Sequence, residues 1–319
     1  MKSEVYNQST CLVSEIAYQY YIEGKKRTEI AEEYSLSPAT ISRVLKRAKA
    51  EGIVEFHIAE PYLECNRLER ELMKRYHLQK ACVVPLPKEP LSEEEVKKLV
   101  ALEGARYVQR VIQDGDILGL TWGGTMYHLI QYLNPCRKVN ASIVTMHGSI
   151  VSCDEKLDVQ TLVNRAAMAF GGKNLSLDEP GLYQTPEELR KMMREKKCRD
   201  IFGIYDKIDI SVSGVGSCFP LPDSPLLKTD YLTKNETEML IQKGVYSDIL
   251  LHFIDKDGRE CDTPLMDRTL SIGLDVYKKI PCKVIVACGA KKANSIMSLL
   301  KGKMVDVLII DYHLAKAVI

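Results

Sequence analysis

Seven short apolar runs, rich in valine and isoleucine, most strongly restrict the fold of this chain. They begin near residue 81, each is apolar on both faces, and helical stretches such as 92–113 and 159–170 fall between several of them. Strands that are buried on both faces and alternate with helices are typical of a doubly wound, mostly parallel α/β sheet. The sequence predicts such a sheet, with strands over ACVVPL (81–86), DILGLTW (116–122), SIVTMH (142–147), DISVSGVG (209–216), DILLHFI (248–254), KVIVACG (283–289) and VDVLIID (305–311).

The first fifty residues have a different pattern, in which apolar residues recur at three- and four-residue spacing in three short blocks. This periodicity predicts three helices. Gly24 suits the turn that ends the first helix, and Thr28 is a candidate N-cap of the second. Ser37 can cap the third helix and Pro38 can take its first position, where a missing N–H costs nothing. The pattern is that of a helix-turn-helix.

The third block is basic on its outer side. Residues 37–50 hold four Lys/Arg and no acid, although residues 1–58 as a whole hold eight Lys/Arg and eight Asp/Glu. Such a local patch can neutralise DNA phosphates, and short polar side chains beside an arginine can read base edges. The alternative is a three-helix packing module with a solvated basic face. We expect DNA contacts from Thr28, Ser37, Pro38, Ala39, Thr40, Ser42, Arg43, Lys46 and Arg47.

Two segments connect the helix-turn-helix to the sheet. Residues 53–58, IVEFHI, alternate in polarity and predict a small β-wing, which makes the N-terminal domain winged-helix-like. Residues 61–77 are expected to form a charged helix with three leucines near one face. This helix is either a plain linker or a dimer contact that spaces two recognition helices. We therefore expect a DNA-binding domain over 1–58 and a linker helix with an effector-binding and oligomerisation domain over 59–319.

The segment TWGGTMYHLI (121–130) places two glycines and a threonine where a strand should turn into a helix. Glycines let backbone N–H groups approach an anion, the threonine adds a hydroxyl, and the following helix presents its positive end. The segment therefore predicts a phosphate-binding loop; a plain turn is the simpler alternative.

The helix-turn-helix, GLTWGGTMYHLI, SGVGS, DKDGRECDTPL and the C-terminal segment 284–319 together resemble the bacterial SorC family of sugar-responsive transcriptional regulators. The resemblance implies an effector domain related in fold to ribose-5-phosphate isomerase, glucosamine-6-phosphate deaminase and CoA transferases. It also implies assembly as dimers or tetramers, and a phosphorylated sugar or similar metabolite as effector.

The resemblance also implies which residues contact the effector. The glycine-rich loop matches the family's phosphate loop, Lys292 matches a lysine before the C-terminal helix, and Asp209 matches an acidic position near the site. Two positions depart from the family pattern: His147 stands where some relatives have a lysine or arginine, and Ala290 stands where a second glycine is usual. The expected effector contacts are Gly123, Gly124, Thr125, His147, Asp209 and Lys292.

The alternative function is a sugar-phosphate isomerase or deaminase. Such an enzyme needs a base beside the substrate carbon, for which Asp209, His147 and Asp311 are candidates. The attached DNA-binding module favours a regulator, most often a repressor in this family, that binds operator DNA. We expect no catalytic residues and no cofactor.

Composition limits the remaining classes. The formal net charge is only +1, so a nucleic-acid partner must meet a local patch instead of a global field. The ten cysteines form no C-x-x-C pair and show no zinc-type spacing, and no apolar stretch reaches the roughly 18 residues that a membrane span needs. We expect a cytoplasmic homo-oligomer without a metal site or a membrane partner.

Overall fold

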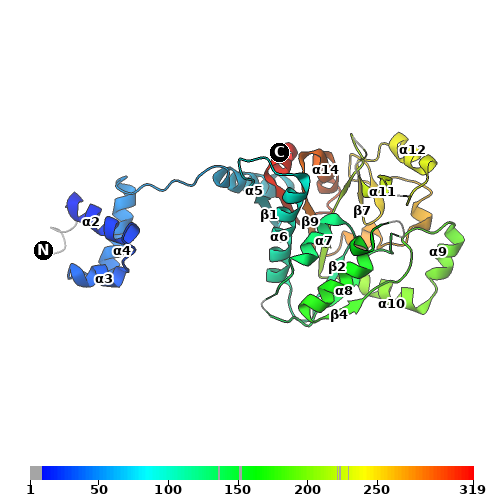
Figure 1. Cartoon of the computed structure of the whole chain (residues 1–319), viewed down its shortest axis with the longest axis horizontal. Helices are drawn as coiled ribbons and strands as arrows, with labels where there is room; N and C mark the ends of the chain where they lie inside the picture. The colour runs from blue at the N-terminus through cyan, green and yellow to red at the C-terminus, as the bar shows by residue number, and fades with distance from the viewer. Residues whose placement is uncertain (1–8, 136, 151–152, 221, 223, 229) are drawn as a thin grey trace. The chain divides into compact units, whose positions relative to one another are not determined.

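The computed structural model describes residues 9–135, 137–150, 153–220, 222, 224–228 and 230–319. The chain divides into two compact units, Met1–Ala59 and Glu60–Ile319, and Figure 1 shows the helices and strands of each.

Residues 9–59 of the first unit, the part that the structure describes, form a bundle of three helices, as the periodicity predicts. These are α2 (Thr10–Tyr21), α3 (Arg27–Glu33) and α4 (Pro38–Ala50). Gly24 has φ +73°, which suits the turn after α2. The Ser37 hydroxyl accepts a hydrogen bond from the Thr40 amide at 3.1 Å, and Pro38 takes the first position of α4. The unit's core consists of buried side chains from all three helices, Val13, Ile16, Ala17, Ile30, Ala31, Ile41, Val44, Leu45 and Ala48.

Two local expectations for this unit are wrong. Thr28 does not cap α3, because the helix begins one residue earlier, at Arg27, and Lys26 occupies the N-cap position. Residues 53–58 form no strand. A wing needs a second strand to pair with, and here the chain continues directly towards the next helix. Phe56 instead packs edge-on against Tyr21, with the rings 5.6 Å apart.

The second unit contains a seven-stranded sheet in the order β1-β10-β9-β5-β2-β3-β4, in which all neighbouring strands are parallel. Six of the seven expected runs form strands of this sheet, and the predicted doubly wound α/β fold is confirmed. The seventh strand, β4, is short and mostly exposed, so it lacks the apolar signal. The strands are β1 (Lys80–Val84), β2 (Ile117–Leu120), β3 (Ser142–Thr145), β4 (Lys173–Leu175), β5 (Ile210–Ser213), β9 (Cys282–Ala287) and β10 (Val307–Asp311).

The run DILLHFI is not one strand of that sheet. It forms a tight antiparallel hairpin of β7 (Ser247–Ile249) and β8 (His252–Ile254), which joins β6 (Gly216–Ser217) in a separate three-stranded sheet. Leu250 and Leu251 make the turn with φ values of 54° and 65°. Such two-residue turns favour Asn-Gly, so two leucines give no turn signal. Both side chains are almost fully buried, and this packing outweighs their backbone preference.

Helices cover both faces of the large sheet. Alternate residues of β9 and β10 belong to two different apolar clusters. One cluster includes α5 (Tyr62–Tyr76), α10 (Lys196–Tyr205), α14 (Ala293–Lys301) and α15 (Tyr312–Val318); the other includes α6 (Glu93–Val111), α7 (Gly124–Gln131) and α8 (Val159–Phe170). Shorter helices are α9 (Pro186–Met192), α11 (Pro225–Lys228), α12 (Lys234–Gln242), α13 (Leu274–Tyr277) and the 3₁₀ turns η1 (Glu155–Leu157), η2 (Met266–Arg268) and η3 (Ala290–Lys292).

Helix α5 is an integral part of the second unit. Its buried residues Cys65, Leu68 and Leu72 belong to the same apolar cluster as β10 and α15. The face that the sequence offered for a plain linker or a dimer contact is therefore occupied within the unit.

Truncating this face should destabilise the second unit. Leu72 is fully buried, so Leu72→Ala should lower the free energy of unfolding by about 2–5 kcal/mol. The exposed neighbour Glu71 provides the matched control, and Glu71→Ala should change stability by less than about 0.5 kcal/mol. Urea unfolding of the full chain checks both, and equal stability losses in the two variants would contradict the packing described.

Candidate functional site

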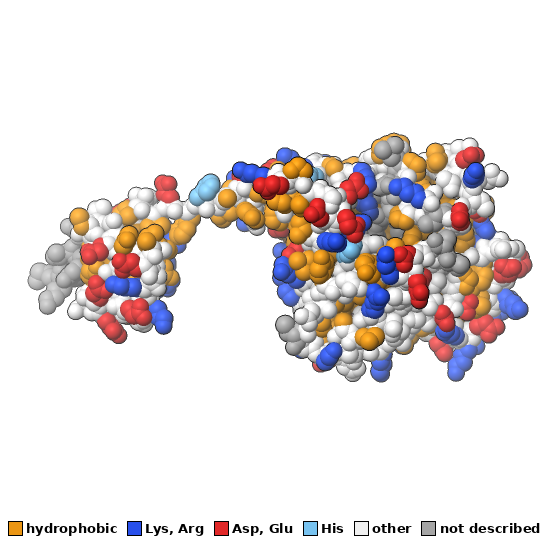
Figure 2. Space-filling model, viewed as in Figure 1, with side chains coloured by type: hydrophobic (Ala, Val, Ile, Leu, Met, Phe, Trp, Pro, Cys, Tyr) orange, Lys and Arg blue, Asp and Glu red, His pale blue; other side chains and the backbone are white. Residues whose placement is uncertain are grey.

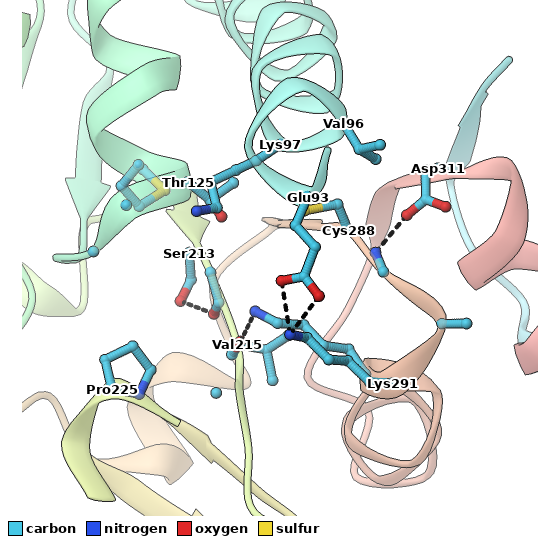
Figure 3. A pocket seen from close by; sticks show the side chains of 18 of the residues that line it. Glu93, Val96, Lys97, Thr125, Ser213, Val215, Pro225, Cys288, Lys291 and Asp311 are labelled. Atoms are coloured by element: carbon cyan, nitrogen blue, oxygen red, sulfur yellow. Dashed lines mark hydrogen bonds and ion pairs between the residues drawn. The ribbon is translucent and has the colours of Figure 1, made fainter. Parts of the chain in front are cut away.

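A pocket of about 1060 Å³ opens at the carboxyl edge of the large sheet (Figure 3). Its walls include the segments 121–126, 213–216, 288–292 and 311–313, which follow or end β2, β5, β9 and β10. The chain passes from β2 to β3 and β4 on one side and from β5 to β9 and β10 on the other, so the direction of winding reverses between β5 and β2. Open α/β sheets bind ligands at such a reversal.

The glycine-rich loop forms one side of this pocket. Gly123 has φ +114°, which an L side chain rarely adopts, and its unusual backbone lets α7 begin at the next residue, Gly124. The first N–H groups of an α-helix have no partner inside the helix, so those of Gly124 and Thr125 are available at its positive end. Thr125 also lines the pocket. This arrangement can hold an anion.

Four lysines line the same pocket, namely Lys97, Lys291, Lys292 and Lys316. The Lys292 ammonium donates to the Val215 carbonyl at 2.6 Å, which fixes its position next to the end of β5. The structure thus brings together Gly123, Gly124, Thr125 and Lys292, four of the six residues expected from the sequence.

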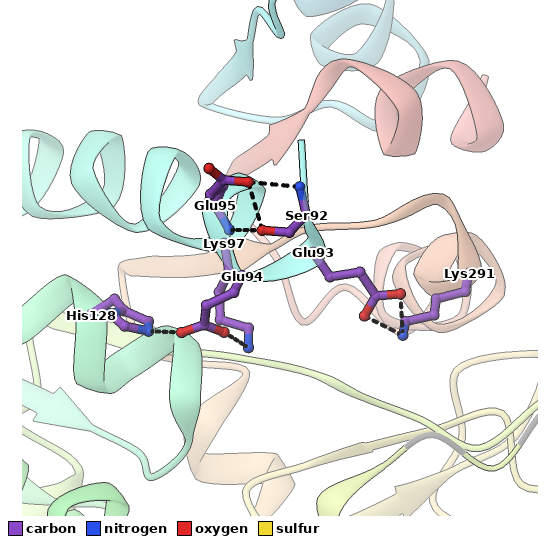
Figure 4. Close-up of polar contacts among 7 residues, drawn as sticks. All are labelled: Ser92, Glu93, Glu94, Glu95, Lys97, His128 and Lys291. Atoms are coloured by element: carbon purple, nitrogen blue, oxygen red, sulfur yellow. Dashed lines mark hydrogen bonds and ion pairs between the residues drawn. The ribbon is translucent and has the colours of Figure 1, made fainter. Parts of the chain in front are cut away.

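Two of the lysines are paired with carboxylates from the first turn of α6 (Figure 4). Glu94 Oε2 lies 2.7 Å from Lys97 Nζ, and Glu93 Oε2 lies 2.9 Å from Lys291 Nζ. The hydrogen bond from Lys97 is the main reason that the pKa of Glu94 is lowered. Neither pair was predicted to belong to a site. In the sequence Glu94 and Lys97 are typical of an exposed helix face, and Lys291 comes next to Glu93 only in the fold.

His147 lies outside the pocket lining and is completely buried. Its Nε2 accepts from the Trp122 amide at 3.2 Å, and its Nδ1 donates to the Gly148 carbonyl at 2.7 Å. Burial lowers its pKa to about 4, so the ring is neutral at pH 7. His147 therefore holds the turn between β2 and α7 through the Trp122 amide, and it does not line the pocket.

Two aspartates considered at the sequence level are engaged in backbone contacts. Asp209 precedes β5 at the amino edge of the sheet, opposite the pocket, and its Oδ2 accepts from the Ile117 amide at 2.9 Å. Asp311 lines the pocket but caps α15, as expected: its carboxylate accepts from the amides of His313 at 2.9 Å and Gly289 at 2.6 Å. Neither His147 nor Asp209 lines the pocket.

Asp248 is a pocket residue that the sequence analysis did not single out. Its carboxyl group is buried, which raises its pKa, while the Ser224 side chain and the positive charge of Lys292 oppose that shift. A Cβ at Gly216 would come within 1.9 Å of Asp248 Oδ1, so only glycine fits beside this carboxyl group. Asp248 can accept hydrogen bonds from hydroxyl groups of a ligand.

The basic side of α4 is the second candidate site. Arg43 and Lys46 are exposed, and Arg43 Nη2 donates to the Thr40 hydroxyl at 3.3 Å. Arg47 is half-buried, with its Nε 2.6 Å from Glu51 Oε1. The other residues expected at DNA, Thr28, Ser37, Pro38, Ala39 and Ser42, are exposed or half-buried at or near the starts of α3 and α4. Arg27 joins these two starts through a 3.5 Å hydrogen bond to the Ser42 hydroxyl.

In the part of the chain that the structure describes, no group of three or more His, Cys, Asp or Glu side chains could hold a metal ion. None of the described helices is long and apolar enough to cross a membrane.

Comparison with known proteins places this geometry in a family. Residues 60–319 match the family model described as "Putative sugar-binding domain". The deoxyribonucleoside regulator of Bacillus subtilis is 28% identical over 305 residues, covering 96% of each chain. The sorbitol operon regulator of Klebsiella pneumoniae is 28% identical over 308 residues, again covering 96% of each chain.

Solved structures show the same likeness over the whole chain. The crystal structure of the full-length sorbitol operon regulator SorC from Klebsiella pneumoniae superposes with a TM-score of 0.76 at 27% identity, covering 98% of this chain and 99% of that one. A transcriptional regulator from Streptococcus pneumoniae shares the fold of the larger unit, with a TM-score of 0.75 at 22% identity over 80% of this chain and 97% of that one. The chain therefore belongs to the SorC family of sugar-binding transcriptional regulators.

Proposed function

We propose that this protein represses a carbohydrate operon by binding operator DNA through α4, and that a phosphorylated sugar or a similar phosphorylated metabolite controls it. The observation that carries the proposal is that the amino end of α7 and Lys292 line the same pocket. Helix-end N–H groups and an ammonium together recognise an anion by charge-assisted hydrogen bonds. Asp248 is placed to accept from sugar hydroxyls in the same pocket.

The side chains considered for catalysis favour sensing over turnover. A general base must reach the proton that it abstracts. His147 is buried beneath the loop, Asp209 lies at the opposite sheet edge, and Asp311 accepts from three backbone amides. We therefore propose a binding role for this pocket and no catalytic residue.

A contact between α5 and the pocket wall supports a regulatory role. Glu64 of α5 accepts from the Tyr312 hydroxyl and lies 3.5 Å from the Lys316 ammonium. Tyr312 and Lys316 both line the pocket. Because α5 is the first helix after the unit boundary at Ala59, a ligand that changes this contact acts on the segment that leads to the DNA-binding unit.

The remaining assignments complete the proposal. Residues 1–58 act as the DNA-binding domain, and residues 59–319 bind the effector and assemble the protein as a homo-dimer or homo-tetramer. Two recognition helices then address a palindromic operator. A transcriptional regulator of this kind acts in the cytoplasm, and the binding chemistry described requires no cofactor.

Helix α4 carries both basic side chains and side chains that can read bases. Single substitutions can therefore separate the two roles. Arg43→Ala should cost about 1–3 kcal/mol in binding to operator DNA and relax specificity, if its guanidinium meets a guanine edge. Lys46→Ala should weaken binding evenly across sequences and reduce the salt slope by about one unit. Lys25→Ala is the charge-matched control, since Lys25 pairs with Glu33 at 2.9 Å. Gel shifts on upstream DNA measure all three, and parental binding by both α4 variants would remove α4 from the interface.

A phosphate requirement should appear in a thermal-shift screen of paired sugars and sugar phosphates. A ligand at about a hundred times its Kd stabilises the folded state by roughly 2.7 kcal/mol, so a responder raises Tm measurably. Responders should be found among the phosphates alone, and Gly124→Val or Lys292→Ala should abolish the shift while DNA binding persists. Equal shifts from a free sugar and its phosphate would refute the phosphate site.

The second unit should keep its assembly and its ligand response without the first. A fragment of residues 60–319 retains both apolar clusters and the whole pocket. We expect it to remain oligomeric at micromolar concentration, by light scattering, and to give the same melting shift as the full chain. A monomeric fragment that still responds to ligand would refute only the assembly part of the proposal.

A further inference from the structure

The amino-terminal part of α6 brings a lysine to the phosphate loop. Lys97 Nζ lies 3.7 Å from the position that a Cβ would occupy at residue 124. Gly124 is the first residue of α7, so the Lys97 ammonium stands beside the amino end of that helix. Figure 3 shows Lys97 reaching from α6 towards Thr125. This ammonium is close enough to the predicted phosphate position to share the same anion.

In the structure, two carboxylates of α6 form ion pairs with two of the lysines that line the pocket. Glu94 holds Lys97 at 2.7 Å, and Glu93 contacts Lys291 through both carboxylate oxygens, at 3.1 and 2.9 Å. Glu94 is itself held by His128 of α7 at 2.5 Å. The two acids are consecutive, whereas their lysines come from α6 and η3. Figure 4 shows the first turn of α6 between these partners.

A phosphate group competes with such carboxylates for the same ammonium groups. It carries up to two negative charges and three acceptor oxygens, whereas each glutamate carries one charge and two acceptor oxygens. An anion at the end of α7 also meets backbone N–H groups, which the glutamates do not use here. The Glu94–Lys97 pair is partly exposed, so the pair itself is weak and exchange of its partner costs little.

We infer that Lys97 is a direct ligand of the anion that binds at the amino end of α7, and that Glu93 and Glu94 act as built-in competitors for Lys291 and Lys97. The inference rests on the proposed anion site. It extends that site from the loop and Lys292 to the first turn of α6. It also makes affinity depend on ligand charge, because a neutral ligand has no group that can replace the carboxylates.

Calorimetric titration of the full chain with inorganic phosphate tests the inference. Lys97→Gln should lower phosphate affinity about tenfold, the value of one charge-assisted hydrogen bond. Glu94→Gln should raise it about two- to fivefold, because Lys97 is then released. Glu95→Gln is the matched control: it removes a charge from the same turn, and its side chain can still accept from the Ser92 amide, as Glu95 does at 2.8 Å. Lys98→Gln, at an exposed lysine outside the pocket lining, controls for the loss of a positive charge.

The double variant Glu94→Gln/Lys97→Gln separates competition from a general charge effect. If Glu94 acts through Lys97, the double variant should bind phosphate as weakly as Lys97→Gln alone. Melting curves without phosphate show that each variant is folded. Unchanged affinity in Lys97→Gln, with affinity lost in Lys292→Ala, would overturn the inference and leave the proposed function standing. Equal gains in Glu94→Gln and Glu95→Gln would overturn the role of Glu94 as a competitor. No phosphate binding by the parent chain would overturn both the inference and the anion site.

Discussion

Helices cover both faces of the parallel sheet in the second unit, so polar binding groups can gather only at the edges where the strands begin and end. The position of the pocket follows from this constraint. Alternate residues of β9 and β10 pack into two separate apolar clusters, so neither face can expose a binding group. Polar side chains gather instead where the strands end, and the segments that follow or end β2, β5, β9 and β10 line the pocket. The backbone contributes as well, because the helix after β2 points its positive end into this space.

The constraint also explains which parts of the fold were predictable. Strands buried on both faces carry a strong apolar signal, so six of the seven strands of the large sheet were predicted, whereas β4 is mostly exposed and gave no signal. The helix-turn-helix was predicted through local chemistry, since Ser37 and Pro38 act within one turn of each other. The hairpin at Leu250 and Leu251 was missed because tertiary packing, and not turn chemistry, holds both residues at positive φ.

The residues of the candidate site likewise divide into those that the sequence predicted and those that it did not. The loop residues Gly123, Gly124 and Thr125 were predicted because a strand, a tight turn and a helix follow one another in the sequence. The resemblance to the family implied that His147 and Asp209 contact the effector, but the direction in which a side chain such as the His147 ring turns is a tertiary fact. Asp209 precedes β5, at the edge opposite the pocket, and the His147 ring turns under the loop to the Trp122 amide. Asp248 and the Glu93–Lys291 pair depend on contacts between distant segments, for which spacing gives no evidence. The Glu94–Lys97 pair is local to α6, but its place in the pocket depends on the fold.

The charges of the pocket connect binding to regulation. A ligand shifts an equilibrium only by the difference between its affinities for two states. In the structure several of the pocket's cations already have carboxylate partners: Lys97 has Glu94, Lys291 has Glu93, and Lys316 has Glu64. In the function that we propose, an anion that takes over these cations would release carboxylates on α6 and α5, and a neutral ligand of the same shape would not. Glu64 belongs to the helix that follows the unit boundary, so the exchange of partners at Lys316 reaches the segment leading to the DNA-binding unit. In this proposal charge serves two purposes, because the group that would give affinity for the anion would also produce the difference between the occupied and the empty state.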